Sequence, residues 1–210
     1  MNTNLFKNLP LMGIVRGIAI EIIEPLLEAV IAAGLKTIEI TMNTPSAGRI
    51  ISKARIVAGG RITIGAGTVV YEEDLRRALD NGAEFIVMPV FDEKIVRCCV
   101  EKTIPVFPGA LTPQEVFHAW QAGADMVKVF PAGRFGPGYI KDIKGPFDKV
   151  KLMAVGGVAL DNIKDYFSCG ADAVAFGGSV LKKQWLDNRD FVSIKNLTNE
   201  YVNTVKSCVV

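Results

Sequence analysis

Short apolar runs alternate along the chain with longer segments in which apolar residues recur at helical spacing. The runs predict strands near residues 11–16, 36–42, 62–66, 84–89, 104–107, 125–130, 151–155 and 172–176, with helices between them. The runs are apolar almost throughout, which is typical of parallel strands covered by helices on both faces. Eight such units predict an α/β fold, a single (β/α)8 TIM barrel over residues 1–210.

An internal repeat supports this interpretation. A helical segment that ends in glycine is followed at once by an apolar run in IAAGLKTIEI, DNGAEFIVMP, QAGADMVKVF and SCGADAVAFG. The glycines Gly34, Gly82, Gly123 and Gly170 suit helix C-caps, and their spacing leaves room for one further strand and helix in each period. Alternating units do not by themselves prove closure, so a doubly wound open sheet is the alternative.

Both ends of the chain carry helical patterns. The stretch LFKNL, residues 5–9, predicts a short helix that plugs the barrel floor. Residues 189–205 place Phe191, Ile194, Leu197, Tyr201 and Val205 at helical spacing, which predicts the last outer helix.

One charged residue interrupts the apolar run MVKVFP, residues 126–131. Strand side chains alternate between faces, so Lys128 shares a face with Met126 and Phe130, while Val127 and Val129 point the other way. If the two valines pack against the outer helices, the amine points into the barrel near its C-terminal end. Barrel enzymes keep their active sites at that end.

The chemistry of such an amine depends on its pKa. A free lysine titrates near about 10.4, but burial can lower this value by up to about 3–5 units. A neutral amine attacks a ketone to give a carbinolamine and then an iminium, which withdraws electrons from the adjacent carbon–carbon bond. The alternative is a structural lysine that is ion-paired or that extends its amine out of the strand end.

A second charge breaks the run TIEITMN. Glu39 lies between Ile38 and Ile40, and in a barrel the inward side chains of the second and sixth strands face one another. We therefore expect its carboxylate to meet the Lys128 amine. The pair could form a structural salt bridge, but buried ion pairs are costly and often mark function, so Glu39 is also a candidate proton carrier.

Glycine pairs end the last two strands, in AVGGV and AFGGSV. Barrels often bind phosphate above these strands, and glycine amides can form an anion cradle there. The glycine pairs and the residue after them place Gly156, Gly157, Gly177, Gly178 and Ser179 together there, which favours a phosphate site, and tight turns are the alternative. GAGT, residues 65–68, lacks the last glycine of a dinucleotide fingerprint, so we assign Thr68 to substrate contact and expect no cofactor.

Composition excludes several classes. The 24 basic and 22 acidic residues form no cationic block, so a nucleic-acid partner is not expected. No apolar run approaches the roughly 18 residues of a membrane span, and MNTNLFKNLP lacks a signal sequence, which predicts a cytoplasmic protein. The four cysteines form no CxxC pair. His118 is the single histidine, so no histidine metal site and no Ser–His–Asp triad is expected.

At Glu39, Lys128 and the paired glycines, the sequence resembles the 2-keto-3-deoxy-6-phosphogluconate (KDPG) and 4-hydroxy-2-oxoglutarate (KHG) aldolases, which are class I pyruvate aldolases. The resemblance covers nearly the whole chain. It rests on motifs in the family's order and approximate spacing, namely IEIT, GAGTV, FIVMP, PVFPGALTP, VKVFPA, GPGYIK, GPF, GGV and GGS.

The resemblance implies a metal-independent lyase of the Entner–Doudoroff pathway that cleaves KDPG to pyruvate and glyceraldehyde 3-phosphate, and KHG to pyruvate and glyoxylate. It implies a homotrimer, a Schiff base at Lys128 and acid–base catalysis by Glu39. It further implies that Thr68 and Pro89 line the pyruvate pocket, that Phe130 packs beside it, and that the phosphate site consists of Gly156, Gly157, Gly178 and Ser179. Arg16 is expected near the substrate carboxylate, although a structural strand-end arginine is the alternative.

Three positions depart from many members, which carry arginine at Asn43, threonine at Val155 and a small or polar residue at Val90. Asn43 and AVGGV look more like the branch acting on the galactonate epimer, so 2-keto-3-deoxy-6-phosphogalactonate (KDPGal) is the alternative substrate. Without that arginine, carboxylate binding could shift to Arg16 and to backbone amides, with Asn43 still among the substrate-binding residues. Rivals of another class are a phosphate-binding barrel isomerase or synthase and a non-catalytic sugar-phosphate sensor.

Overall fold

The computed structural model describes residues 3–209, and residues 1, 2 and 210 of the predicted domain lie outside the described residues. Its sheet is entirely parallel, with the strand order β5-β4-β3-β2-β1-β9-β8-β7-β6. The strands are β1 Leu11–Val15, β2 Thr37–Thr41, β3 Thr63–Gly67, β4 Ile86–Val87, β5 Val106–Phe107, β6 Gly109–Ala110, β7 Val127–Val129, β8 Leu152–Val155 and β9 Ala173–Phe176.

The two ends of this strand order are adjacent in the chain. β5 and β6 are separated only by Pro108, and their direct continuity turns the sheet into a nearly closed barrel. Proline has no backbone N–H to donate, so the ladder lacks a donor at this residue, although the Pro108 carbonyl accepts a hydrogen bond from the Lys128 N–H at 2.8 Å. The predicted fifth strand, 104–107, is therefore wrong in extent: it starts later, and a second short strand, β6, follows it. The barrel itself is confirmed, and the open-sheet alternative is not.

Six of the other seven strands are shorter than predicted, because their apolar runs continue beyond the paired residues, whereas β3 keeps the predicted length and is shifted by one residue. The largest difference is at residues 84–89, where only Ile86–Val87 forms β4. At this strand Glu84 lies before the ladder and Pro89 lies after it. An apolar run therefore reports burial, which extends further along the chain than the strand pairing does.

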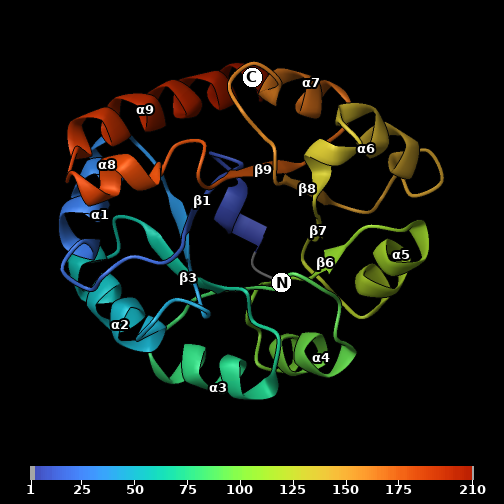
Figure 1. Cartoon of the computed structure of the whole chain (residues 1–210). Coiled ribbons are helices and arrows are strands. Elements are labelled where there is room, and N and C mark those ends of the chain that lie inside the picture. The colour runs from blue at the N-terminus through green and yellow to red at the C-terminus, as the bar shows by residue number, and fades with distance from the viewer. Residues whose placement is uncertain (1–2, 210) are drawn as a thin grey trace.

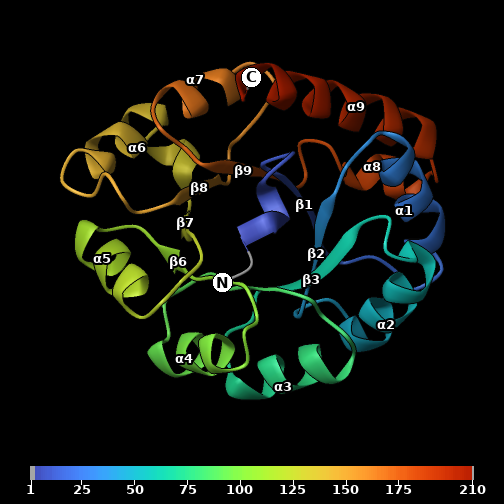
Figure 2. The ribbon, with the colours of Figure 1, turned by 180° about the vertical axis from the view of Figure 1, so that it is seen from behind.

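Helices surround the barrel on its outer side in both views (Figures 1 and 2). The predicted closing helix is confirmed as α9, and the short helix α8 before it was not predicted. The helices are α1 Ile23–Ala32, α2 Ala47–Ala58, α3 Glu72–Asp80, α4 Glu93–Glu101, α5 Pro113–Gln121, α6 Pro137–Lys144, α7 Ile163–Ser168, α8 Lys183–Asp187 and α9 Phe191–Cys208, with 3-10 turns η1 Thr3–Phe6 and η2 Ala132–Arg134.

The barrel wall separates two apolar clusters. The outer cluster lies between sheet and helices and includes Val127 and Val129, which confirms the predicted outward face of that strand. The inner cluster includes Met126 from the other face of the same segment, and Phe6, whose ring meets that of Phe107 edge-on at 5.5 Å between centroids. The predicted floor plug is confirmed, but its helical turn is Thr3–Phe6 rather than residues 5–9.

Acidic side chains fix the start of three strands. Each of these residues stands two positions after one of the repeated helix-ending glycines. Its carboxylate accepts a hydrogen bond from a backbone N–H of a neighbouring strand. The acceptors are Glu84, Asp125 and Asp172, and the donors are the amides of Ile64, Val106 and Leu152, respectively. The repeat therefore carries a hydrogen-bonding device as well as a helix cap.

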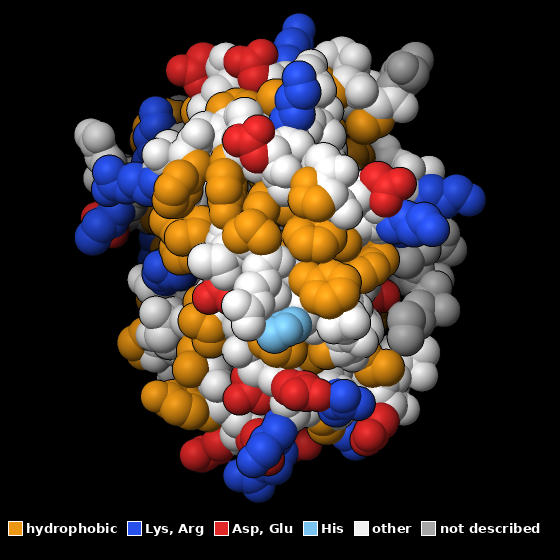
Figure 3. All heavy atoms as spheres, turned by 90° about the vertical axis from the view of Figure 1, so that its right-hand side faces the viewer, with side chains coloured by type: hydrophobic (Ala, Val, Ile, Leu, Met, Phe, Trp, Pro, Cys, Tyr) orange, Lys and Arg blue, Asp and Glu red, His pale blue; other side chains and the backbone are white. Residues whose placement is uncertain are grey.

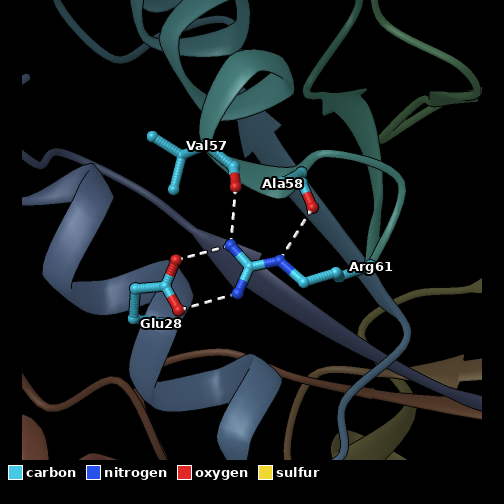
Figure 4. A network of polar contacts seen from close by, with 4 residues as sticks. All are labelled: Glu28, Val57, Ala58 and Arg61. Carbon is cyan, nitrogen blue, oxygen red and sulfur yellow. Dashed lines mark hydrogen bonds and ion pairs between the residues drawn. The ribbon is translucent and has the colours of Figure 1, made fainter.

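Arg61 links two outer helices at the N-terminal end of the barrel (Figure 4). Its guanidinium forms two hydrogen bonds with the carboxylate of Glu28 on α1, at 2.8 and 2.5 Å. It also donates to the carbonyl oxygens of Val57 and Ala58 at the end of α2, at 2.7 and 3.2 Å. These carbonyls lack partners within the helix, so one side chain both caps α2 and joins it to α1.

Hydrophobic side chains gather on the side of the molecule that carries α5 and α6, around the single histidine (Figure 3). Phe117 of α5 stacks on Phe147 at 5.6 Å between ring centroids, and Phe135 lies against Tyr139 of α6 at 5.0 Å. Phe117 and Phe135 are both exposed.

Among residues 3–209, no helix is long and apolar enough to span a lipid bilayer.

Candidate active site

Lys128 lies at the middle of β7 and is only 6% exposed. Its side chain lies on the same face of the strand as that of Met126, which points to the barrel interior, as the alternation predicts. Its ammonium lies 5.2 Å from the centroid of the Phe130 ring, which is 41% exposed at the C-terminal end of the strand. The amine therefore sits just below the mouth of the barrel, beside an aromatic surface that solvent reaches.

Glu39 occupies the equivalent level of β2 and is 1% exposed. Its neighbours in the sheet are Ile14 of β1 and Gly65 of β3. Its Oε1 atom occupies the space that a side chain at Gly67 would fill, so the carboxylate requires glycine there. Its Oε2 atom is buried and has no hydrogen-bond partner within the described chain. A buried polar atom without a partner is costly, which marks this oxygen as available to a ligand.

The charges of this site act on one another. Burial lowers the pKa of Lys128, against the opposing effect of the Glu39 carboxylate, and Arg16 lowers it further. Burial likewise raises the pKa of Glu39, against the effects of Lys128 and Arg16. Both shifts favour the uncharged forms, a neutral amine facing a protonated carboxyl group. A neutral amine is nucleophilic, and a protonated carboxyl group can donate a proton.

The predicted keto-acid residues lie at the C-terminal end of the barrel. Arg16 follows β1 and donates from its guanidinium to Thr68 Oγ1 at 3.5 Å. Thr68 follows β3 in a left-handed conformation, with a φ of 55°. Pro89 follows β4 and is half-buried, whereas Asn43 is exposed in the turn after β2. The structure thus brings Arg16 and Thr68 together and places Phe130 beside Lys128, while Asn43 forms no hydrogen bond with the other four in the described chain.

The two glycine loops meet above β8 and β9. Gly156 and Gly157 adopt φ values of 85° and 82°, which residues other than glycine rarely adopt. Ser179 Oγ donates to the carbonyl of Val158 at 3.4 Å, which joins the two loops. Gly157, Gly178 and Ser179 are exposed, and within residues 3–209 their amides donate no hydrogen bond to another residue. Three unused amides on adjoining loops can bind an anion.

Sequence patterns missed two residues that shape the site. Gly67 makes room for Glu39, and Gly133 approaches the Gly156–Gly157 turn so closely that a Cβ on Gly133 would clash with the Cα of Gly157. The Gly133 amide donates to the Gly156 carbonyl at 2.7 Å. Each is a single glycine in a region rich in glycine, and nothing in the linear sequence indicates its spatial neighbour. In the described chain, His, Cys, Asp and Glu residues form no group of three that could hold a metal ion.

Comparison with known proteins decides the family. The family model described as KDPG and KHG aldolase matches residues 3–197. The chain belongs to this family. KDPG/KHG aldolases are class I aldolases, lyases that break a carbon–carbon bond, and this chain is one of them.

Individual aldolases of the family resemble most of the chain. The chain is 35% identical over 176 residues to the 2-dehydro-3-deoxy-6-phosphogalactonate aldolase of Escherichia coli, covering 83% of this chain and 85% of that protein. It is 33% identical over 186 residues to the 2-dehydro-3-deoxy-phosphogluconate aldolase of Haemophilus influenzae, covering 87% and 86%.

A solved KDPG aldolase from Legionella pneumophila superposes with a TM-score of 0.89 at 25% identity, covering 95% of this chain and 97% of that one. That structure captured pyruvate as a covalent carbinolamine intermediate.

Proposed function

We propose that this aldolase reversibly cleaves KDPG to pyruvate and glyceraldehyde 3-phosphate through a Schiff base on Lys128. The observation that carries the proposal is a buried amine of lowered pKa that faces a buried carboxyl group with one unpartnered oxygen. The fold is shared with a KDPG aldolase that held pyruvate covalently. KHG would follow the same route to pyruvate and glyoxylate.

The reaction begins when the neutral Lys128 amine attacks the C2 ketone. Glu39 first donates its proton to the carbinolamine hydroxyl, which leaves as water and gives an iminium. The iminium accepts the electrons of the C3–C4 bond as that bond breaks. Glu39 takes the proton of the C4 hydroxyl, through a water or the substrate carboxylate, while glyceraldehyde 3-phosphate leaves. The remaining enamine is protonated at C3, and water hydrolyses the resulting iminium to pyruvate and the free amine.

Residues around the barrel mouth bind the keto acid. Arg16 supplies the cation for the carboxylate, and Thr68, to which its guanidinium is hydrogen-bonded, supplies a hydroxyl. Pro89 and Phe130 provide the apolar wall around the methylene carbon that becomes the pyruvate methyl. Asn43 contacts the substrate further out, from its exposed turn.

The phosphate binds to the adjoining glycine loops of Gly156, Gly157, Gly178 and Ser179. Support comes from their unused amides and from the Ser179 hydroxyl, which lies at the junction of the two loops. Backbone amides bind the phosphate oxygens closely only where no side chain intervenes, which accounts for glycine at three of the four positions.

The galactonate epimer KDPGal is a second candidate substrate. Asn43 and Val155 look like the branch that acts on it, and Val155 lies buried in the barrel interior at the end of β8. The E. coli relative described above carries the name of that activity. Values of kcat/KM for KDPG, KDPGal and the unphosphorylated acid separate the candidates. Preference for the phosphorylated acids supports the glycine-loop site, and equal use of the unphosphorylated acid contradicts it.

Lys128→Met tests the central assignment. Borohydride with pyruvate should reduce the iminium and inactivate the native enzyme irreversibly, with a mass increase at one lysine. The Lys128→Met protein should neither gain this mass nor release pyruvate, whereas Lys36→Met, at an exposed lysine near the barrel floor, should do both. Pyruvate release by the Lys128→Met protein would refute the assignment. If the native protein turns over substrate but is not trapped by borohydride, an isomerase or synthase is favoured. If it binds substrate without turning it over, a sensor is favoured.

We also propose that residues 1–210 form one aldolase domain that acts as a cytoplasmic homotrimer in the Entner–Doudoroff pathway. No nucleic-acid, membrane, metal or cofactor partner enters the proposal, which needs only the small-molecule substrate. The exposed aromatic residues on the α5–α6 side support self-association, because large apolar patches on a protein surface commonly mark contact sites.

A further inference from the structure

Two threonine hydroxyls are buried at the C-terminal end of β2, just beyond Glu39. Thr41 is 0% exposed, Thr44 is 3% exposed, and their Oγ1 atoms form a hydrogen bond at 3.1 Å. Neither hydroxyl is used by the chemistry described above. Thr44 Oγ1 also accepts a hydrogen bond at 2.9 Å from the backbone N–H of Gly17, which belongs to the loop after β1. The pair therefore links the β2 loop to the residue that follows Arg16.

The Gly17 backbone has little else to hold it. No heavy atom beyond its chain neighbours lies within 4 Å of the position that a Cβ would take at this residue, and its φ is 65°. The same stretch borders a cavity of ≈570 Å³, whose lining includes Arg16, Gly17, Ile18, Ala19, Leu181 and Leu186. A loop that faces open space on one side depends on its remaining hydrogen bonds for a fixed position.

Arg16 is the side chain that this anchor would place. It is exposed, and its one side-chain hydrogen bond in the described chain is the long contact of 3.5 Å to Thr68. A long side chain with so little support reaches a fixed point only if its own backbone is fixed, because any movement at the Cα is carried to the guanidinium. The Gly17 amide is the adjoining peptide group, so its bond to Thr44 restricts that movement.

We propose that Thr44, oriented by Thr41, is a positioning residue that holds the Arg16 loop so that the guanidinium meets the carboxylate of the bound keto acid. The inference rests on the proposed function, because it assumes that Arg16 binds this carboxylate. Thr44 touches no reacting atom and acts only through the Gly17 amide. Both epimeric sugar acids share the carboxylate, so the role is the same whichever substrate is preferred.

Borohydride trapping with pyruvate measures this role directly, since pyruvate carries the ketone and the carboxylate and nothing else. In Thr44→Val, the pyruvate concentration that gives half-maximal inactivation should rise on the order of tenfold, as expected when a charge-assisted contact is misplaced. The maximal inactivation rate at saturating pyruvate should stay within about threefold of the native value, because the Lys128 amine is untouched. Thr44→Ser keeps the hydroxyl and should restore native half-saturation.

Matched controls separate positioning from general loss of structure. Thr198→Val removes another buried threonine hydroxyl, one without a hydrogen-bond partner in the described chain, and should leave pyruvate half-saturation unchanged. Trapping with acetone, a ketone without a carboxylate, should be the same in Thr44→Val and the native enzyme. In an Arg16→Met background, adding Thr44→Val should cause no further rise in half-saturation.

The proposal is overturned if Thr44→Val binds pyruvate like the native enzyme, or if its effect persists in the Arg16→Met background or with acetone. Should Thr44→Val fail to fold, Thr41→Val gives the decision: it removes the hydroxyl that orients Thr44 toward the Gly17 amide, so half-saturation should rise, and an unchanged value would refute the role. Failure of the native enzyme to be trapped by pyruvate would instead refute the proposed function.

Discussion

Lys128 and Glu39 show how an apolar barrel changes the chemistry of two ordinary side chains. Each is the only charged residue in its strand, and burial favours the neutral form of both. The pair could be predicted because a charge inside an apolar strand is conspicuous in a linear sequence. Gly67, whose missing side chain makes room for the Glu39 carboxylate, could not, because only the folded sheet brings it beside Glu39.

Glu39→Gln should separate the two functions of this carboxyl group. Proton transfer is lost, so kcat should fall by about 10²–10⁴. Where Glu39 is ionised, its charge raises the pKa of Lys128, so the permanently neutral glutamine should let this pKa fall further and move the acid limb of the pyruvate-trapping profile to lower pH. Trapping rates measured across pH, beside steady-state kcat, check both. A limb that moves upward, or an unchanged kcat, would contradict this assignment.

At the scale of the strands and helices, the positions of elements could be predicted far better than their ends. Apolar runs locate every strand except β6, but the ladder ends wherever hydrogen-bond partners end, as at Pro108. The repeated glycines indicate helix ends correctly. Glu84, Asp125 and Asp172, two residues after three of these glycines, accept hydrogen bonds from backbone amides of neighbouring strands. The sequence shows their positions, but the hydrogen bonds can be assigned only when the neighbouring strands are known.

Asp125 provides the test of this strand-start device. Asp125→Ala leaves the Val106 amide without its acceptor and should lower the free energy of unfolding by about 1–2 kcal/mol, whereas Asp125→Asn keeps an acceptor and should cost less. Denaturant titrations at neutral pH measure both.

The stability difference between the native protein and Asp125→Asn should depend on pH. Burial raises the pKa of Asp125, so the native state binds its proton more readily than the unfolded state does. The native protein should therefore lose stability relative to Asp125→Asn as the pH rises through that raised pKa, and regain it as the pH falls. A difference that does not vary with pH would contradict the buried-charge interpretation.

At the scale of the whole molecule, eight units of strand and helix indicated a barrel without proving that it closes. The barrel closes because β5 and β6, the two ends of the strand order, are joined through Pro108. The periodic pattern of apolar residues does not indicate that these two ends meet. The outer surface is less predictable still. Exposed aromatic residues on the α5–α6 side come from several segments, and only the folded chain shows that they gather on one face (Figure 3).

The homotrimer proposal predicts a particle three times the chain mass of 22.7 kDa in sedimentation equilibrium. Phe117→Asp places a charge on the stacked pair of Phe117 and Phe147, and it should shift the distribution toward smaller species because a carboxylate is costly to bury at a contact. Phe191→Asp, at a half-buried aromatic on α9 away from this face, serves as the control. A native protein that sediments as a single chain would rule out the trimer.

Pro108 divides one chain segment between two neighbours, because β5 pairs with β4 and β6 pairs with β7. Gly109, on one side of Pro108, abuts the Pro89 carbonyl so tightly that no side chain fits between them. Each of these two pairings covers only two residues, and the contact between Gly109 and Pro89 lies directly beside the predicted pyruvate wall. If the barrel opens locally, the least costly opening is at these short ladders, so deuterium uptake should begin on the strands that flank Pro108 and slow when a keto acid occupies the mouth.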